Sequence, residues 1–220
     1  MILFLKSFII GIGKIIPGVS GAMLAINFNI YERALDAITN FFSDWKQNLK
    51  FILIFSLGVI LAMVACSGII LYLIENHFFI TMMLFIGLIF GGTYNFSKEV
   101  KYNYKNILII TLVVILLSII SFSNFHNYYQ LKGNFIDNIV FFIGGIIEIF
   151  SSIVPGISGT ALFMIMGIYN HILTITASIF NITYVINNIN LYISYGIGMF
   201  ISFIVNSYLI NYLFPVLYFY

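Results

Sequence analysis

The chain has very little charge for its length. Asp, Glu, Lys and Arg make up only 7% of its 220 residues, whereas 62% are hydrophobic. A soluble globular domain carries roughly 25% charged residues, so this chain lacks the charge to cover its own surface in water. The segment 149–220 contains no charged residue at all. The composition therefore excludes a soluble fold and predicts that lipid surrounds the protein.

Cysteine is almost absent as well. Cys66 is the single cysteine, which excludes an intrachain disulfide and a thiolate metal site. The three histidines fall at expected span ends without the spacing of a metal cluster, so we expect no metal and no other cofactor. The net charge of +2 is too small to suggest a nucleic-acid partner. The N-terminal apolar run lacks a small-residue cleavage site, and we expect it to be retained.

Four hydrophobic runs are long enough to cross a bilayer as helices, which takes about 20 residues. They cover residues 51–74, 78–96, 107–123 and 191–213. The last run stops before Pro215 and precedes an aromatic tail of the kind enriched at the headgroup level. These runs predict an all-α polytopic membrane protein.

Two further hydrophobic segments are each interrupted by a Pro-Gly pair. Proline removes a backbone donor and clashes with the preceding turn, and glycine adds freedom, so each pair should end a helix. The pattern favours two re-entrant helical hairpins that enter and leave the membrane by the same face. The alternative is a pair of short full spans joined by a tight turn. The flanking runs are 2–16 and 19–30 around Pro17-Gly18, and 139–154 and 157–180 around Pro155-Gly156.

The two interrupted segments repeat each other at a shift of 138 residues. Between Ile15 and Leu35, nine of 21 positions are identical to their shifted partners, namely positions 15, 17, 18, 20, 21, 24, 30, 31 and 35. The matches include the whole Pro-Gly-x-Ser-Gly motif. Apolar composition alone could supply the Leu and Ile matches, but not this paired motif.

An odd number of full spans, three, separates the two motifs. The second copy therefore enters from the opposite face, which is an inverted-topology repeat of the kind common among secondary transporters. We expect one transmembrane domain over 1–220, with repeat 1 at about 1–75, central spans at about 78–124 and repeat 2 at about 137–213.

The basic residues predict an orientation. On this topology seven fall on one face and one, Lys132, on the other, so the positive-inside rule places both termini in the cytoplasm. The Asn-rich segment 181–190 is then an uncharged external loop. The seven are Lys6, Arg33, Lys46, Lys50, Lys98, Lys101 and Lys105.

Each Pro-Gly break is also a candidate anion site. A helix should start after each break, near Ser20 and Ser158, and a helix start offers free N–H donors and the positive end of a dipole. The alternative is that Ser and Gly only permit tight turning and close packing. The candidate substrate-binding residues are Lys14, Pro17, Gly18, Ser20, Gly21, Glu148, Ser152, Pro155, Gly156, Ser158, Gly159 and Thr160.

Lys14 and Glu148 are the charged members of this set. A charge at membrane depth costs roughly 2.5–3.5 kcal/mol on insertion scales and marks a functional candidate. Lys14 could hold an anionic head group, and Glu148 could pair with it or take a coupling proton. The alternatives are snorkelling towards an interface or a simple structural ion pair.

The paired motifs, Pro17 to Gly21 followed by Tyr31, and Pro155 to Gly159 followed by Tyr169, resemble the bacterial polyprenyl-phosphate transporter family (PopT-type) over essentially the whole chain. The resemblance implies translocation of undecaprenyl phosphate back to the cytoplasmic leaflet of the bacterial plasma membrane, for reuse in envelope synthesis. Two features depart from the family. The first motif continues Ala22-Met23 instead of Gly-Thr, and charged residues stand at 14 and 148, where members usually carry small or uncharged ones.

Three functions compete on the sequence. A lipid-phosphate transporter needs only a small anionic pocket, because the isoprenoid tail can stay in the bilayer. A transporter or channel for a soluble anion needs a continuous hydrophilic path, and few polar residues occur in the spans. A membrane enzyme on lipid phosphate needs a base or nucleophile with a partner, and no such pair adjoins either break. We therefore expect a transporter with no catalytic residue and make no prediction of its oligomeric state.

Overall fold

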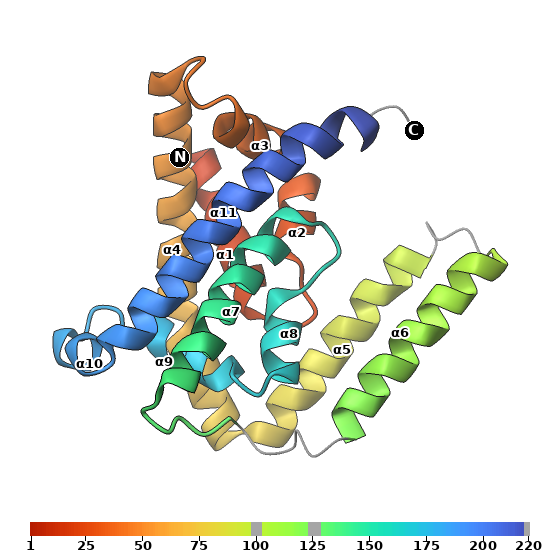
Figure 1. Cartoon of the computed structure of the whole chain (residues 1–220), viewed down its shortest axis with the longest axis vertical. Helices are drawn as coiled ribbons and strands as arrows, with labels where there is room; N and C mark the ends of the chain where they lie inside the picture. The colour runs from red at the N-terminus through yellow and green to blue at the C-terminus, as the bar shows by residue number, and fades with distance from the viewer. Residues whose placement is uncertain (98–102, 123–128, 218–220) are drawn as a thin grey trace.

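The computed structural model of the protein describes residues 1–97, 103–122 and 129–217, and within these ranges all regular secondary structure is helical (Figure 1). The helices are α1 Ile2–Ile15, α2 Gly21–Asn27, α3 Tyr31–Thr39, α4 Trp45–Asn76, α5 Phe78–Ser97, α6 Tyr104–Phe122, α7 Phe135–Ile153, α8 Gly159–Ile165, α9 Tyr169–Ala177, α10 Ile182–Asn187 and α11 Ile189–Leu217.

Among the residues that the structure describes, three helical stretches are long and apolar enough to cross a membrane: α4, α7 and the Ile189–Ser207 part of α11. The apolar parts of α5 and α6 whose side chains are described, Phe78–Gly91 and Tyr104–Ile115, are shorter. The predicted all-α membrane protein is confirmed at this level. On α6 the large apolar side chains are exposed, as at Ile109 and Leu112, which is the surface expected where lipid is the solvent.

Several predicted boundaries were wrong. The run predicted at 139–154 begins earlier, because Asn134 and Asp137 form a capping box that starts α7 at Phe135. The resulting helix is long enough to cross a bilayer. The run 157–180 is divided into α8 and α9 around Gly167, whose φ is +72°. Helix α11 continues through Pro215 to Leu217 and does not stop before the proline as predicted.

The Asn-rich segment 181–190 was also misjudged as a loop. Asn181 accepts a hydrogen bond from the Tyr184 N–H and thereby caps the short helix α10. Asn188 ends that helix, and α11 begins at the next residue. Asparagine favours helix ends as much as loops, so its enrichment marked the boundaries of helices here.

The two predicted repeats fold with matching contacts. Helix α1 packs along α4, and α7 packs along α11. The cross-contacts are reciprocal too, since α2 touches α7 and α8 touches α1, while α9 packs on α4 and α3 packs on α11. In Figure 1, α1 and α4 run downwards and α2 returns upwards, whereas α7 and α11 run upwards and α8 returns downwards.

Small residues bring the paired helices close. A Cβ atom added at Gly11 of α1 would lie 2.5 Å from the Val59 carbonyl oxygen of α4, and one at Gly198 of α11 would collide with the Phe142 carbonyl of α7. Membrane helices depend on such close packing because the hydrophobic effect contributes little to helix association in lipid. Gly58 also lies at such a contact, whereas an added Cβ at Gly87, Gly91 or Gly196 would have no described atom within 4 Å.

A buried carboxylate fixes the start of α7. Asp137 accepts hydrogen bonds from the Tyr129 hydroxyl at 2.5 Å and from the Lys132 and Gly133 N–H groups. Burial and the bond to Asp137 raise the pKa of Tyr129 to about 12. Tyr129 therefore stays protonated near neutral pH and can donate its hydrogen bond to Asp137. This bond holds the segment 129–134 against the start of α7.

Candidate functional site

The two Pro-Gly breaks have the same backbone conformation. Helix α1 ends at Ile15 and α7 at Ile153. Gly18 has a φ of +84° and Gly156 a φ of +86°, a left-handed conformation that glycine adopts at little cost. The motif thus forces the chain to reverse at both places.

A helix starts after each break near Ser20 and Ser158, as predicted, and in both cases the serine caps it. The Ser20 hydroxyl accepts a hydrogen bond from the Met23 N–H at 3.5 Å, and the Ser158 hydroxyl accepts one from the Ala161 N–H at 3.4 Å. Both serines are N-caps, of α2 and α8 respectively. Each hydroxyl thus satisfies one of the N–H groups that a helix start leaves free.

The structure brings the two breaks into contact. The Gly18 N–H donates to the Ser158 hydroxyl at 3.4 Å, although the two residues are 140 positions apart. The Thr160 hydroxyl donates to the Ile16 carbonyl at 3.4 Å. Both contacts join the first break to the start of α8.

Two tyrosines cross between the repeats in a reciprocal way. The Tyr31 hydroxyl donates to the Ile153 carbonyl at 2.6 Å, and the Tyr169 hydroxyl donates to the Ile15 carbonyl at 2.7 Å. These carbonyls belong to the last turns of α7 and α1, where a helix leaves acceptors without partners. Our sequence analysis noted the tyrosines only as matched positions. Their identity at one fixed distance after each break was the signal of this role.

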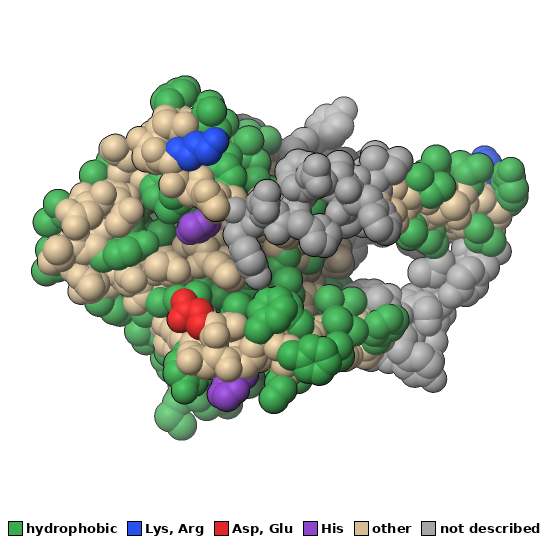
Figure 2. Space-filling view, turned by 90° about the horizontal axis from the view of Figure 1, so that it is seen from below, with side chains coloured by type: hydrophobic (Ala, Val, Ile, Leu, Met, Phe, Trp, Pro, Cys, Tyr) green, Lys and Arg blue, Asp and Glu red, His purple; other side chains and the backbone are tan. Residues whose placement is uncertain are grey.

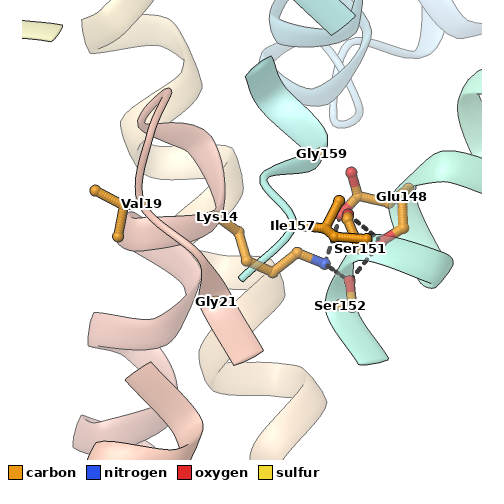
Figure 3. Close-up of a pocket in the computed structure, with 8 residues that line it drawn as sticks. All are labelled: Lys14, Val19, Gly21, Glu148, Ser151, Ser152, Ile157 and Gly159. Carbon is orange, nitrogen blue, oxygen red and sulfur yellow. Dashed lines mark hydrogen bonds and ion pairs between the residues drawn. The ribbon is translucent and has the colours of Figure 1, made fainter. Parts of the chain in front are cut away.

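Lys14 reaches from α1 across to α7, as Figure 3 shows. Its ammonium lies 2.5 Å from Glu148 Oε1 and donates to the Ser152 hydroxyl at 2.6 Å. Glu148 Oε1 has no hydrogen-bond partner among the described residues, so this contact is counted as an ion pair. Both side chains are largely buried, with 15% of Lys14 and 5% of Glu148 exposed. The ammonium therefore points into the protein and does not snorkel.

Further groups hold this pair in place. The Ser152 hydroxyl donates to the Glu148 carbonyl at 2.5 Å, and the Tyr195 hydroxyl of α11 donates to Glu148 Oε2 at 3.3 Å. Lys14 and Ser152 differ by 138 positions, so they are equivalent residues of the two repeats. Tyr195 was not among the predicted site residues, because it has no sequence signal beyond being a tyrosine in a predicted span.

A small pocket surrounds the ion pair where the two breaks meet. Its volume is about 10 Å³, which is room for about one water molecule. Two of the predicted glycines are needed for its shape, because a Cβ at Gly21 would lie 2.6 Å from Lys14 Cγ, and a Cβ at Gly159 would collide with Ser151. The lining residues are Lys14, Val19, Gly21, Glu148, Ser151, Ser152, Ile157 and Gly159.

Five predicted site residues thus share one pocket: Lys14, Gly21, Glu148, Ser152 and Gly159. The remaining predicted residues form the breaks and helix caps beside it and are not among its lining residues. These are Pro17, Gly18, Ser20, Pro155, Gly156, Ser158 and Thr160. Chemically, the pocket offers the Lys14 ammonium and the Ser151 and Ser152 hydroxyls as donors to an anion, and the Glu148 carboxylate lies beside them.

Comparison with known proteins gives a consistent result. Over residues 10–218 the sequence matches the VCA0040-like family, which is described as undecaprenyl phosphate translocase-like. A polyprenyl-phosphate transporter of Staphylococcus aureus (strain NCTC 8325 / PS 47) is 26% identical over 217 residues, a match covering 94% of this chain and 76% of that relative. No solved structure matches the chain significantly. The chain belongs to the undecaprenyl phosphate translocase-like family.

Proposed function

We propose that this protein translocates polyprenyl phosphate across the membrane, with Lys14 binding the phosphate while the isoprenoid tail stays in lipid. The observation that carries the proposal is the buried Lys14 ammonium, placed among hydroxyls where two broken helices meet. The family and its Staphylococcus aureus relative support the substrate class, since both are named for polyprenyl phosphates.

The charge on Lys14 matters more in this proposal than the helix starts. Helices α2 and α8 have only seven residues each, and their own serines already bond to N–H groups in the first turn. A phosphate leaving water needs a counter-charge, which a hydroxyl cannot supply. Lys14 supplies that charge, and Ser151 and Ser152 can add hydrogen bonds.

The second break offers a lateral route to lipid. Pro155 and Gly156 are exposed, and an added Cβ at Gly156 would have no described atom within 4 Å. Exposed apolar side chains, Phe150 and Met164, lie on the helices on either side of this break. A phosphate can therefore enter from this side while its tail remains among acyl chains.

We also propose that the two breaks belong to re-entrant hairpins in an inverted repeat, within one domain over 1–220. In Figure 1 the start of α1 and the whole of α3 lie towards the upper end, whereas the start of α7 and the whole of α9 lie towards the lower end. Each broken segment thus begins and ends on one side, and the two sides differ. The reciprocal bonds of Tyr31 and Tyr169 support the same pseudo-symmetry.

The upper end in Figure 1 is the proposed cytoplasmic side of a bacterial plasma membrane, with both termini inside. Helices α3 and α4 begin near that end and carry Arg33, Lys46 and Lys50 there. Figure 2 shows the opposite face, where few charged side chains gather. Lys98 and Lys101 lie outside the described residues. The positive-inside rule supports this orientation.

Reconstituted vesicles test the proposal. Polyprenyl phosphate is distributed over both leaflets, and an impermeant phosphatase added outside hydrolyses only the outer-leaflet share in protein-free vesicles. With the protein inserted, we expect the entire pool to be hydrolysed. Hydrolysis that stops at the protein-free level would contradict the proposal. Uptake of radiolabelled inorganic phosphate, without movement of the lipid, would instead identify a soluble-anion transporter.

A further inference from the structure

The pocket in this structure already holds an anion, the carboxylate of Glu148. Its Oε1 is 2.5 Å from the Lys14 ammonium, and the pocket volume of about 10 Å³ leaves room for about one water. A phosphate group is several times larger than water and needs the same ammonium. It can therefore bind Lys14 only after the pocket widens and Glu148 gives up its place.

A displaced Glu148 would be a buried carboxylate without a cation. Its side chain is 5% exposed, and its other described partner is the neutral hydroxyl of Tyr195 from α11. The sequences of α2 and α8, which pack against α7, contain no titratable side chain. Isolated buried carboxylates are so costly that they bind a proton instead.

We infer that Glu148 carries one proton with each phosphate, so that this protein is a proton-coupled symporter whose Lys14 exchanges a carboxylate for a phosphate. The inference rests on the proposed function. When phosphate enters, it takes Lys14, and Glu148 takes one proton from water on the same side. When phosphate leaves on the other side, Glu148 releases that proton there and pairs with Lys14 again. One proton and one phosphate anion have then crossed together.

The coupling follows from the pair because the two occupants of Lys14 exclude each other. An unpaired, ionised Glu148 beside a bound phosphate would put two negative charges against one ammonium in a dry site. An unpaired Lys14 would leave a buried cation. Both states are costly, so the favoured states are the empty ion pair and the phosphate with a protonated Glu148.

Vesicles with an enclosed pH dye and the membrane potential clamped at zero test this inference. With wild-type protein, adding polyprenyl phosphate outside should acidify the interior by one proton per phosphate that crosses. An outside pH one unit lower should give about a tenfold excess of the singly charged lipid phosphate in the inner leaflet. Movement of the lipid without protons would overturn the inference and leave the proposed function intact. No movement of the lipid would overturn both.

Variants of Glu148 test whether its carboxyl group is the one that carries the proton. Glu148→Gln should equilibrate the lipid slowly, without acidification and without response to the pH gradient. Glu148→Asp keeps a titratable group and should keep the coupling, which covers the case in which Glu148→Gln does not fold. The matched control is Asp36→Asn, which removes the carboxylate of the exposed Arg33–Asp36 pair and should behave like wild type. Proton movement retained in Glu148→Gln would exclude Glu148 as the carrier.

Discussion

The two Pro-Gly breaks share a motif and a backbone conformation but lie in different surroundings. Pro17 is fully buried, and an added Cβ at Gly18 would collide with Ile89 of α5. Pro155 and Gly156 are exposed, with no described atom within 4 Å of an added Cβ at Gly156. The motif therefore dictates how the chain turns, and the neighbouring helices dictate which turn is buried.

The charges differ between the repeats as well. Lys14 of the first copy corresponds to Ser152 of the second, and Glu148 of the second corresponds to Ile10 of the first. Each copy thus contributes one half of the ion pair. The proposed function needs only one cation for one phosphate, which is consistent with unrepeated charges on a repeated motif.

The largest expected effect comes from removing the cation. Lys14→Ala leaves Glu148 buried without a cation, a loss of about 3–5 kcal/mol for such pairs. We expect translocation to fall by at least about a hundredfold, or about 3 kcal/mol, while the protein still inserts. Lys14→Arg should retain part of the activity because the charge survives. The measurement is phosphatase accessibility normalised to inserted protein, and full activity in Lys14→Ala would show that the lysine has only a structural role.

Moving the cation to the other repeat sharpens this test. In the double variant Lys14→Ser with Ser152→Lys, the new lysine lies one helical turn from Glu148, a spacing at which helix side chains interact. We expect part of the activity of Lys14→Ser to be recovered. No recovery would mean that the ammonium must come from α1, and that the two copies are not interchangeable.

Alanine substitutions at Gly18 and Gly156 separate the energetic cost of the turn conformation from the cost of contacts with neighbouring helices. Both substitutions should cost about 1–2 kcal/mol through the positive φ. Gly18→Ala should cost about 1–3 kcal/mol more, because its Cβ also meets Ile89. Thermal unfolding in detergent should rank Gly18→Ala well below Gly156→Ala. Equal losses in the two variants would show that α5 yields to the new methyl group.

The reciprocal tyrosines should give a smaller difference. Phenylalanine keeps the ring and removes a hydrogen bond worth about 1 kcal/mol. Tyr169 is buried and Tyr31 is only partly buried, so water can replace the lost bond more easily at Ile153 than at Ile15. We expect Tyr169→Phe to lower the unfolding temperature more than Tyr31→Phe. The reverse order would contradict this difference in water access between the Ile15 and Ile153 carbonyls. The burial of the first break would then be limited to Pro17.

The smallest effect is expected at the serine caps. Ser20→Ala removes one long cap bond, whereas Ser158→Ala also removes the acceptor of the Gly18 N–H and a contact with Thr160. Loss of an N-cap typically costs about 1 kcal/mol. Ser158→Ala should therefore be the more destabilised of the pair in the same unfolding assay. Indistinguishable variants would show that the contact between the breaks adds nothing to stability.

Sequence reasoning succeeded where the signal was local. Proline and a left-handed glycine act on their own backbone, so both breaks and the helix starts near Ser20 and Ser158 could be predicted from the motif. It failed where a few neighbouring residues outweighed the hydrophobic pattern. Asn134 with Asp137 lengthened α7, and Asn181 with Asn188 bounded α10.

By itself the sequence determined that lipid is the solvent and that the chain turns at Pro17-Gly18 and Pro155-Gly156. It also determined that Lys14 and Glu148 are charged residues within apolar segments, which marks them as functional candidates. Only the tertiary structure decided that these two side chains, 134 positions apart, pair with each other across α1 and α7. It also decided that Ile89 of α5 packs against Gly18 of the first break, whereas no described atom lies within 4 Å of an added Cβ at Gly156. The physical reason is range: a backbone preference acts within one turn, whereas an ion pair or a covering helix depends on how the whole chain has packed.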